Sequence, residues 1–479
     1  MSSSGTLIEG RLKHLESHLE QENPVLLDTV RSFRKLDEAS YRMGLLNADE
    51  SYATQIPWWP LISVLGTFSS GKSTFINHYL GFKLERTGNQ AVDDRFTVIC
   101  YSREETSHAL PGVALDSDPR FPFYQMSEEI EKVAAGEGRR IDAYLQLKTC
   151  PSERLRGKIL IDSPGFDADA QRTSTLRITD YIMDLSDLVL VMFDARHPEP
   201  GAMKDTLDHL VSKTINRPDS GKFLYILNQL DTTAREDNPE EVVAAWQRAL
   251  GDRGLTAGRF YTIYNPDSAI PIEDDQLRER FERKRDADLG EIHGRMHEVE
   301  IERAYRIVGA LEKTARDIEE QAVPALQEAL ARWKRRVLWG DGIVLGLLAV
   351  LLLFLVLDSG GLNAPWLQNL TGNPFLFWGG LGLLVVGAIG IHFLIRKAAA
   401  RSLTRTLRRH MEQIGFKGDL VAAFQRSTRP WHSIFRKNPV GWNRKVRSKL
   451  KEVIEDADNY VQTLNDRFTN PSGGGSKES

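Results

Sequence analysis

A chain of 479 residues with a formal net charge of only −4 has room for about two to four structural units and lacks the basic excess of a bulk nucleic-acid binder. Hydrophobic residues make up 41% and charged residues 27%, so most of the chain can fold around ordinary cores. Cys100 and Cys150 stand in no metal-binding or redox spacing, and we expect buried apolar thiols in a reducing compartment. We expect no nucleic-acid partner.

Residues 1–54 predict two N-terminal helices of a helical domain. Apolar residues recur there at helical spacing, and Pro24 separates the two helices because proline suits the first turn of the second. The opening residues lack an apolar core and are too charged for a secretory signal. We therefore expect the N-terminus to stay in the cytosol.

Residues 55–285 alternate apolar strands with helical segments, which indicates a mostly parallel α/β sheet. The first strand lies in the apolar run Trp58–Gly66 and is closed by a glycine-rich loop. The clearest later strands lie in KILIDSP, DLVLVMFDA, KFLYILNQ and RFYTIYN.

The sequence GTFSSGKS, between a predicted strand and a predicted helix, fits a phosphate-binding loop. Small residues let backbone N–H groups turn inward and cradle phosphates. Lys72 would reach the β and γ phosphates, the Ser73 hydroxyl would hold Mg²⁺, and the helix would point its positive dipole end at the anion. The predicted ligands in this loop are Gly66, Ser69, Ser70, Gly71, Lys72, Ser73 and Thr74.

Two later strand ends support a nucleotide site. ILIDSPGFD ends a strand with Asp162, which can reach the Mg²⁺ water shell, and the Gly165 amide can sense the γ-phosphate and drive a switch. FLYILNQLD ends another strand with Asn228 and Asp231, as in the guanine-reading NKxD motif, with Gln229 in place of Lys. An Asp carboxylate accepts two N–H groups that guanine offers together and adenine does not, although this segment could also be only a polar strand end.

Together these residues resemble the nucleotide-binding domain of the dynamin superfamily, and within it the EH-domain-containing (EHD) ATPases. GTFSSGKSTFI is similar to the family's loop, with Phe68 where conventional dynamins carry a catalytic Gln. The first switch, the insert after it, the second switch and the next strand are matched by DDRFTVI, LPGVALDSDPRFPF, DSPGFDADAQR and DLVLVMFDA. The resemblance implies an α/β P-loop nucleoside triphosphatase of the dynamin type that uses GTP and Mg²⁺. ATP stays open, because EHD proteins prefer it despite a guanine-type motif.

The resemblance also implies a role for the first switch. The family usually carries a Thr just before "DRF" that helps hold Mg²⁺ and the attacking water, and here that position is Asp93. Thr97 and Thr87 are nearby substitutes, and the spacing does not choose between them. The candidate catalytic residues are therefore Lys72, Asp93 and Thr97, and we expect nucleotide binding with slow turnover.

Residues 286–336 return to a helical period and predict a helical neck. Residues 337–395 then hold two apolar segments of about the 20 residues that a spanning helix needs, with Asp341 close enough to the headgroups to be tolerated. These segments predict a two-helix transmembrane hairpin; the alternative is a buried hairpin in a soluble core. Glycines that allow close helix packing are Gly342, Gly346, Gly379, Gly382 and Gly387.

Charge sets the expected orientation of the hairpin. Lys and Arg residues flank both segments, while the loop between them has none. The positive-inside rule therefore places both termini in the cytosol. The membrane would be the inner or plasma membrane if the protein is bacterial. Residues 396–468 are basic and helical with interleaved tryptophans and Phe435, which fits anionic lipid headgroups or, equally, a solvated helical face. The tail 469–479 is predicted to be disordered.

The order of these parts resembles mitofusins and bacterial dynamin-like proteins. The hypothesis is a membrane-anchored GTPase or ATPase that self-assembles through its nucleotide domains and remodels the bilayer. Two alternatives are a membrane-tethered regulatory switch that recruits a partner and a scaffold that binds nucleotide without turnover.

Overall fold

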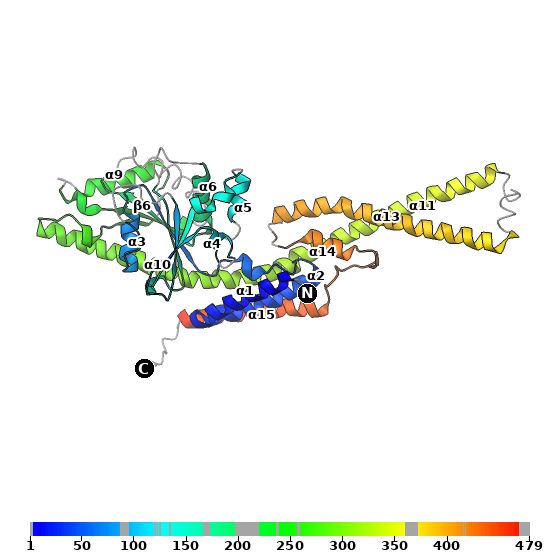
Figure 1. Ribbon diagram of the computed structural model, residues 1–479, viewed down its shortest axis with the longest axis horizontal. Coiled ribbons are helices and arrows are strands. Elements are labelled where there is room, and N and C mark those ends of the chain that lie inside the picture. The colour runs from blue at the N-terminus through cyan, green and yellow to red at the C-terminus, as the bar shows by residue number, and fades with distance from the viewer. Residues whose placement is uncertain are drawn as a thin grey trace. The chain divides into compact units, whose positions relative to one another are not determined.

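The computed structural model describes residues 3–86, 95–118, 121, 123, 126–133, 136–165, 173–196, 220–235, 239–255, 259–359, 372–414, 416 and 418–468 (Figure 1). The chain divides into two compact units. One unit is Thr54–Ile307, and the other combines Met1–Ala53 with Val308–Ser479.

The first unit is built on an eight-stranded sheet in the order β3-β4-β2-β5-β1-β6-β7-β8. Its strands are β1 (Leu61–Gly66), β2 (Phe96–Tyr101), β3 (Ala109–Pro111), β4 (Leu145–Cys150), β5 (Ile159–Asp162), β6 (Leu188–Asp194), β7 (Phe223–Asn228) and β8 (Arg259–Thr262). Neighbouring strands run parallel except for the pairs β2–β5 and β3–β4. The predicted mostly parallel sheet is confirmed, with an antiparallel pairing at β2.

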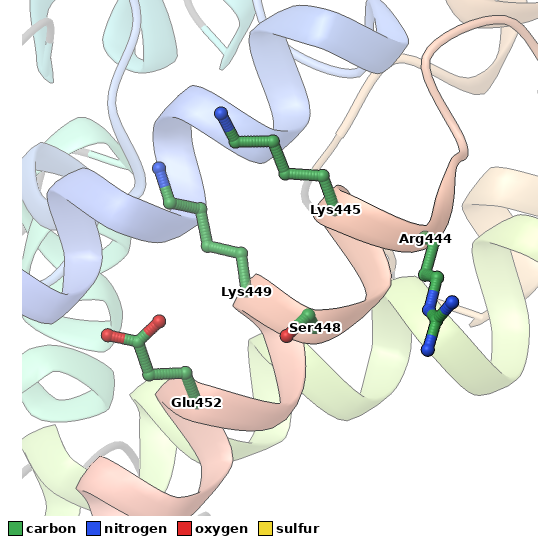
Figure 2. Close-up of a pocket in the computed structure, with 5 residues that line it drawn as sticks. All are labelled: Arg444, Lys445, Ser448, Lys449 and Glu452. Atoms are coloured by element: carbon green, nitrogen blue, oxygen red, sulfur yellow. The ribbon is translucent and has the colours of Figure 1, made fainter.

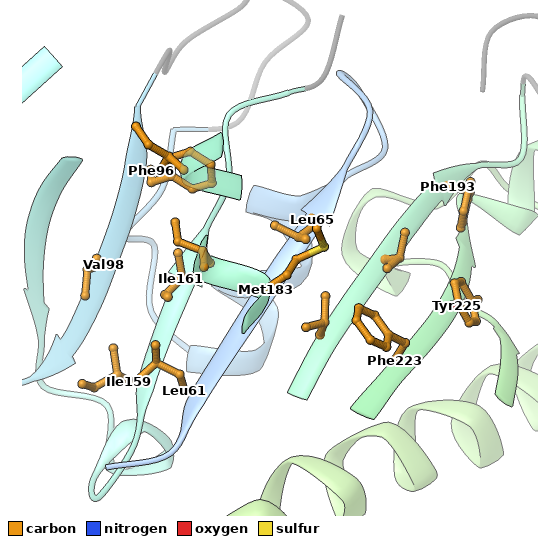
Figure 3. Packing of buried hydrophobic residues seen from close by; sticks show 14 of the residues in the cluster. Leu61, Leu65, Phe96, Val98, Ile159, Ile161, Met183, Phe193, Phe223 and Tyr225 are labelled. Atoms are coloured by element: carbon orange, nitrogen blue, oxygen red, sulfur yellow. The ribbon is translucent and has the colours of Figure 1, made fainter. Parts of the chain in front are cut away.

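Helices on both faces explain why the strands read as continuous apolar runs. Leu61 and Leu65 pack into one core cluster, drawn in Figure 3, while Ile62 and Val64 pack into a second cluster. Successive side chains of a strand point to opposite faces, so one strand feeds both clusters. The described helices of this unit are α3 (Lys72–Leu80), α4 (Val113–Asp116), α5 (Met126–Val133), α6 (Thr173–Leu185), α9 (Pro239–Asp252) and the first part of α10 (Asp275–Asp317). Short 3₁₀ turns are Tyr52–Gln55, Gly138–Ala143, Glu153–Leu155, Ser220–Lys222, Leu230–Arg235 and Pro266–Ser268.

Buried charges fix α10 to the sheet at the start of β1. The Arg303 guanidinium donates to Asp187 Oδ1 at 3.0 Å and to the Pro57 carbonyl at 2.8 Å. The other carboxylate oxygen of Asp187 accepts from the backbone N–H of Leu61 at 2.8 Å. Both charged side chains are buried, so each compensates the desolvation of the other.

The second unit is helical and is assembled from distant parts of the chain. Its elements are α1 (Ser3–Glu22), α2 (Pro24–Met43), the end of α10, a π-helical turn at Ile318–Ala322, α11 (Val323–Asp358), α13 (Pro374–Ile414), α14 (Leu420–Ser427) and α15 (Arg444–Phe468). Pro24 occupies the first turn of α2, as expected. α15 lies beside α2, where Lys35 Nζ pairs with Glu452 at 2.7 Å and with Asp456 at 2.8 Å (Figure 1).

A hollow on α15 is lined by one face of that helix (Figure 2). Lys449 pairs with Glu38 on α2, and Glu452 pairs with Lys35. Two of the charges around the hollow are therefore already used to hold α15 against α2. The lining residues are Arg444, Lys445, Ser448, Lys449 and Glu452.

α11 and α13 contain the two predicted apolar segments and run side by side (Figure 1). Each is long and apolar enough to cross a membrane, and none of the residues in its most apolar stretch is buried. The Leu383 side chain, for example, is 76% exposed. A helix in a soluble core would bury this surface, so the exposure argues against the soluble alternative.

The predicted packing glycines do not lie at the contact between these helices. A Cβ added at Gly342, Gly346, Gly379, Gly382 or Gly387 would meet nothing within 4 Å in this chain. A Cβ added at Gly340 would lie 2.6 Å from Cγ2 of Ile395. Close approach therefore occurs at the base of the helix pair, beside the contact of Asp341 Oδ2 with His392 Nδ1 at 2.7 Å.

Candidate nucleotide-binding site

The phosphate-loop sequence connects β1, in the middle of the sheet, to α3. Gly71 directly precedes the helix in the left-handed region, with φ +83°, and Ser69 also has a positive φ of 60°. A side chain at Gly71 would meet the amide nitrogen of Asn228, so glycine is needed for both conformation and space. The half-buried Thr74 lies in the first turn of α3.

Lys72 lies against the loop's own carbonyl groups. Its Nζ donates to the Gly66 carbonyl at 3.1 Å and to the Thr67 carbonyl at 2.9 Å. Burial lowers the pKa of this ammonium group, and the nearby Asp162 carboxylate partly offsets that effect. An anion at the loop would be a stronger partner for the ammonium group than these neutral carbonyls.

Ser73 and Asp162, the two predicted metal ligands, are brought together. Ser73 Oγ donates to Asp162 Oδ2 at 3.3 Å. Asp162 is buried, and its Oδ1 has no hydrogen-bond partner among the described residues. Burial raises the pKa of this carboxyl group, although Lys72 opposes the shift. A hydroxyl beside an unpartnered buried carboxylate oxygen fits Mg²⁺, which takes hard oxygen ligands and keeps several waters.

Gly165 follows β5 and lies against the phosphate loop. A Cβ there would be 2.9 Å from the Phe68 Cα, so the backbone approaches the loop more closely than another residue would allow. The predicted switch glycine is therefore within reach of the loop.

Two side chains at the end of β7 donate hydrogen bonds to the phosphate loop. Asn228 Nδ2 donates to the Ser70 carbonyl at 2.9 Å, and Gln229 Nε2 donates to the Ser69 carbonyl at 2.6 Å. Asp231 is buried, its Oδ2 accepts from the backbone N–H of Ile270 at 2.8 Å, and burial raises its pKa. The structure thus uses Asn228 to hold the loop, while Asp231 follows it in the turn after β7.

Arg196 is a loop contact that sequence reasoning missed. Its guanidinium binds Asp194 through both carboxylate oxygens and donates to the Ser69 carbonyl at 3.3 Å. Asp194 ends β6, next to β7 in the sheet. The only available signal was a charged pair at the end of an apolar strand.

Of the three candidate catalytic residues, the structure describes Lys72, at the start of α3, and Thr97, in β2. Thr97 lies inside β2, buried, where its Oγ1 accepts from Gln146 Nε2 at 2.7 Å. Its backbone lies opposite Asp162 in the β2–β5 register. Asp93 and Thr87 lie outside the described residues.

Comparison with known proteins points to the same part of the chain. Residues 62–230 match the family model described as Dynamin family. EH domain-containing protein 1 of Homo sapiens is 27% identical over 182 residues, which cover 36% of this chain and 31% of that protein. EH domain-containing protein 2 of Rattus norvegicus is 25% identical over 201 residues, 40% of this chain and 34% of that protein. The similarity thus spans about a third of the length of these relatives.

Two solved structures described as an oligomerised bacterial dynamin pair, with a mechanism for long-range sensing and tethering of membranes, are similar at 12% and 13% identity. They cover 97% of this chain and 68% and 76% of theirs, with TM-scores of 0.33 and 0.31. The family match lies within the nucleotide unit.

Proposed function

Because residues 62–230 form a G domain of the dynamin superfamily, we propose that this chain is a membrane-anchored nucleoside triphosphatase that assembles and remodels membrane. The observation that carries the proposal is the convergence of Lys72, Ser73 and Asp162 at the end of β1, in a chain that also carries two exposed apolar helices. GTP is the proposed nucleotide, with ATP as the alternative.

The loop residues would divide the work of binding. Backbone N–H groups of residues 66–74 would surround the phosphates, and Lys72 would exchange the Gly66 and Thr67 carbonyls for phosphate oxygens. Ser73 and Asp162 would hold Mg²⁺, which when bound neutralises phosphate charge. The backbone N–H of Gly165 would contact the γ-phosphate. The Asp231 carboxylate would accept hydrogen bonds from the nucleotide base.

The membrane part of the proposal rests on α11 and α13. Their apolar faces are exposed over lengths that match a bilayer core, and basic residues flank the pair on both sides. We propose a two-pass integral membrane protein with both long flanks in the cytosol. Association between nucleotide domains would then bring anchored copies together and curve the bilayer.

The surroundings of the first switch favour slow hydrolysis, as expected of a switch that recruits a partner or of a scaffold. The Thr97 hydroxyl is buried in β2 and accepts a hydrogen bond from Gln146, which leaves it one lone pair and its proton for water or Mg²⁺. Asp93, at the position of the usual switch threonine, would bring a negative charge beside the phosphates.

The test is turnover of GTP and of ATP by the full-length protein in liposomes at rising protein density. A rate per molecule that climbs with density, for one nucleotide, supports assembly and identifies the base. A flat and very slow rate for both nucleotides contradicts the assembling enzyme and favours the switch or scaffold. Electron microscopy of the same liposomes separates remodelling from recruitment.

A further inference from the structure

The loop that connects α14 to α15, residues 428–443, is fixed on the helical unit without forming a helix or strand of its own. We call it the foot loop. The Ser427 hydroxyl accepts from the backbone N–H of Val440 at 3.0 Å, and Gln327 on α11 donates to the Asn438 side chain at 2.9 Å. Gly441 lies against the Arg42 backbone, too close for any side chain there. The surface of the foot loop is therefore held in a defined place.

Arg396 ties the foot loop to the base of the helix pair. Its guanidinium donates to three foot-loop carbonyls, those of Arg429 at 3.1 Å, Pro430 at 3.2 Å and His432 at 2.7 Å. The same group lies over the ring of Trp333, 5.2 Å from its centroid. Trp333 in turn donates from Nε1 to the Arg396 carbonyl at 3.1 Å.

Arg396 also marks the height at which the exposed apolar surface of α13 ends. Just before it, Leu394 is 68% exposed, whereas Leu403, two turns beyond, is 2% exposed. The change means that α13 passes there from a surface without a protein cover to one packed inside the helical unit. If the exposed part crosses a bilayer, the foot loop lies at the boundary between hydrocarbon and water.

The foot loop exposes two large aromatic side chains among cations. Trp431 is 71% exposed and Phe435 is 64% exposed. Arg429 lies over the Trp431 ring and Lys334 over the Phe435 ring, 5.4 and 4.9 Å from the centroids. Arg436 and Lys437 are also exposed, and the foot loop contains no acidic residue.

This combination matches one surface in particular. Tryptophan favours the layer of lipid headgroups, and clustered Lys and Arg bind anionic lipids at the cytosolic face. We propose that the foot loop is a second membrane-contact element that inserts Trp431 and Phe435 among the headgroups of the cytosolic leaflet and binds anionic phospholipids through Arg429, Arg436 and Lys437. The inference rests on the proposed membrane anchoring and adds a lipid-selective contact beside the hairpin.

The test uses full-length protein in vesicles of phosphatidylcholine, with or without phosphatidylglycerol. Cys100 and Cys150 are replaced by Ser, and one new cysteine carries an environment-sensitive dye. Ser433→Cys places the dye between the two foot-loop aromatics, Phe354→Cys places it on the apolar part of α11, and Glu455→Cys places it on the exposed side of α15. Spin-labelled lipids quench the dye at headgroup depth or at acyl-chain depth.

The proposal expects headgroup-depth quenching at position 433 and none at 455, with stronger quenching when phosphatidylglycerol is present. Each cation near an anionic surface contributes about fivefold, so R429Q/R436Q/K437Q should lower the ratio of docked to undocked foot loop by about 100-fold in phosphatidylglycerol vesicles. Circular dichroism and nucleotide affinity of that variant should match the parent. Equal quenching of parent and variant overturns the lipid-binding role.

Two further outcomes separate this inference from the anchoring on which it rests. Acyl-chain quenching at 354 with a water-exposed dye at 433 overturns the inference and leaves the anchored protein standing. A dye at 354 that no lipid quenches overturns the anchoring, and the inference with it. A dye at 433 that is shielded from water yet unreachable by either quencher shows that protein covers the foot loop, which also overturns the lipid proposal.

Discussion

The sheet of the nucleotide unit and the pair α11–α13 are both built from long apolar runs, yet they place that surface in opposite environments. All seven residues of β6 are buried, while the most apolar stretch of α13 has no buried residue. The two regions differ in the length of their apolar runs. A run of six or seven residues between turns can be covered by helices, whereas an apolar helix of about twenty residues that is exposed in the described structure has the length of a bilayer span.

The largest expected effect comes from placing one carboxylate in each region. Val191→Asp in β6 buries an unpaired charge and should cost more than about 4 kcal/mol, enough to unfold the nucleotide unit. Leu383→Asp should leave nucleotide binding in detergent intact and reduce membrane integration by about 3 kcal/mol. Denaturant unfolding and carbonate extraction measure the two effects. If the Leu383 variant lost nucleotide binding, the exposed helix pair and the buried sheet would not respond separately, which would contradict the comparison of the two regions.

The second effect concerns the edge of the sheet where the loop lies. Lys72→Ala removes an ammonium group that would make charge-assisted bonds to two phosphates, and GTP affinity should fall about 1,000-fold, or about 4 kcal/mol. Lys83→Ala, on an exposed side chain beyond α3, is the matched control and should keep the parent affinity. Isothermal titration measures both variants. Unchanged affinity of the Lys72 variant would end the proposed function.

The third effect compares two buried carboxylates. Asp37 in the helical unit has partners for both oxygens, the Ser51 hydroxyl at 2.5 Å and the Tyr52 backbone N–H at 2.9 Å, whereas Oδ1 of Asp162 has none among the described residues. Burial raises the pKa of Asp37 from 3.8 to about 6, although those hydrogen bonds oppose the shift. The folded state therefore binds the proton more tightly than the unfolded chain does.

Its contribution to stability should be complete below about pH 4 and be lost as the pH rises to about 6, a change of about 3 kcal/mol. Asp37→Asn should remove this slope, and Asp49→Asn, at an exposed position, should keep it. Urea unfolding of the helical unit at several pH values measures it. If the unfolding free energy of the Asp37 variant still falls with rising pH, another group is responsible for that dependence.

The smallest expected effect lies at the base of the hairpin. Gly340→Ala introduces a methyl group against Ile395 and should weaken the contact of α11 with α13 by about 1 kcal/mol. Gly342→Ala meets nothing within 4 Å and should have no effect. Unfolding in mixed micelles that contain dodecyl sulfate compares the two variants. Equal losses would mean that helix propensity or a second copy, and not this contact, governs both positions.

The sequence was sufficient for elements whose signal is local. The strands around Asp162, Asn228 and the phosphate loop are short apolar runs with turn residues at their ends, and each was predicted and is present. The antiparallel pairing of β2 with β5 was not predicted, since pairing direction depends on the path of the whole chain.

The site could be predicted only in part for the same reason. The motifs give Lys72, Ser73 and Asp162 separately, and the structure adds the contact between Ser73 and Asp162 across 89 residues. The support that Gln229 gives the loop joins residues 160 apart in sequence, and no spacing conveys it. The engagement of Thr97 by Gln146 likewise depends on strand pairing, which brings β2 beside β4.

The helical unit is built from both ends of the chain, and this has a consequence for biosynthesis. α2 leaves the ribosome early, but its partner α15 is synthesised only after the nucleotide unit and both apolar helices. Until then α2, whose Ser32 and Lys35 contact Asp456 of α15, lacks that partner. The nucleotide unit is one continuous segment and can fold before this happens. Closure of the helical unit would therefore be the last step, and a nascent chain stalled before α15 would offer α2 to chaperones or to α15 of another copy.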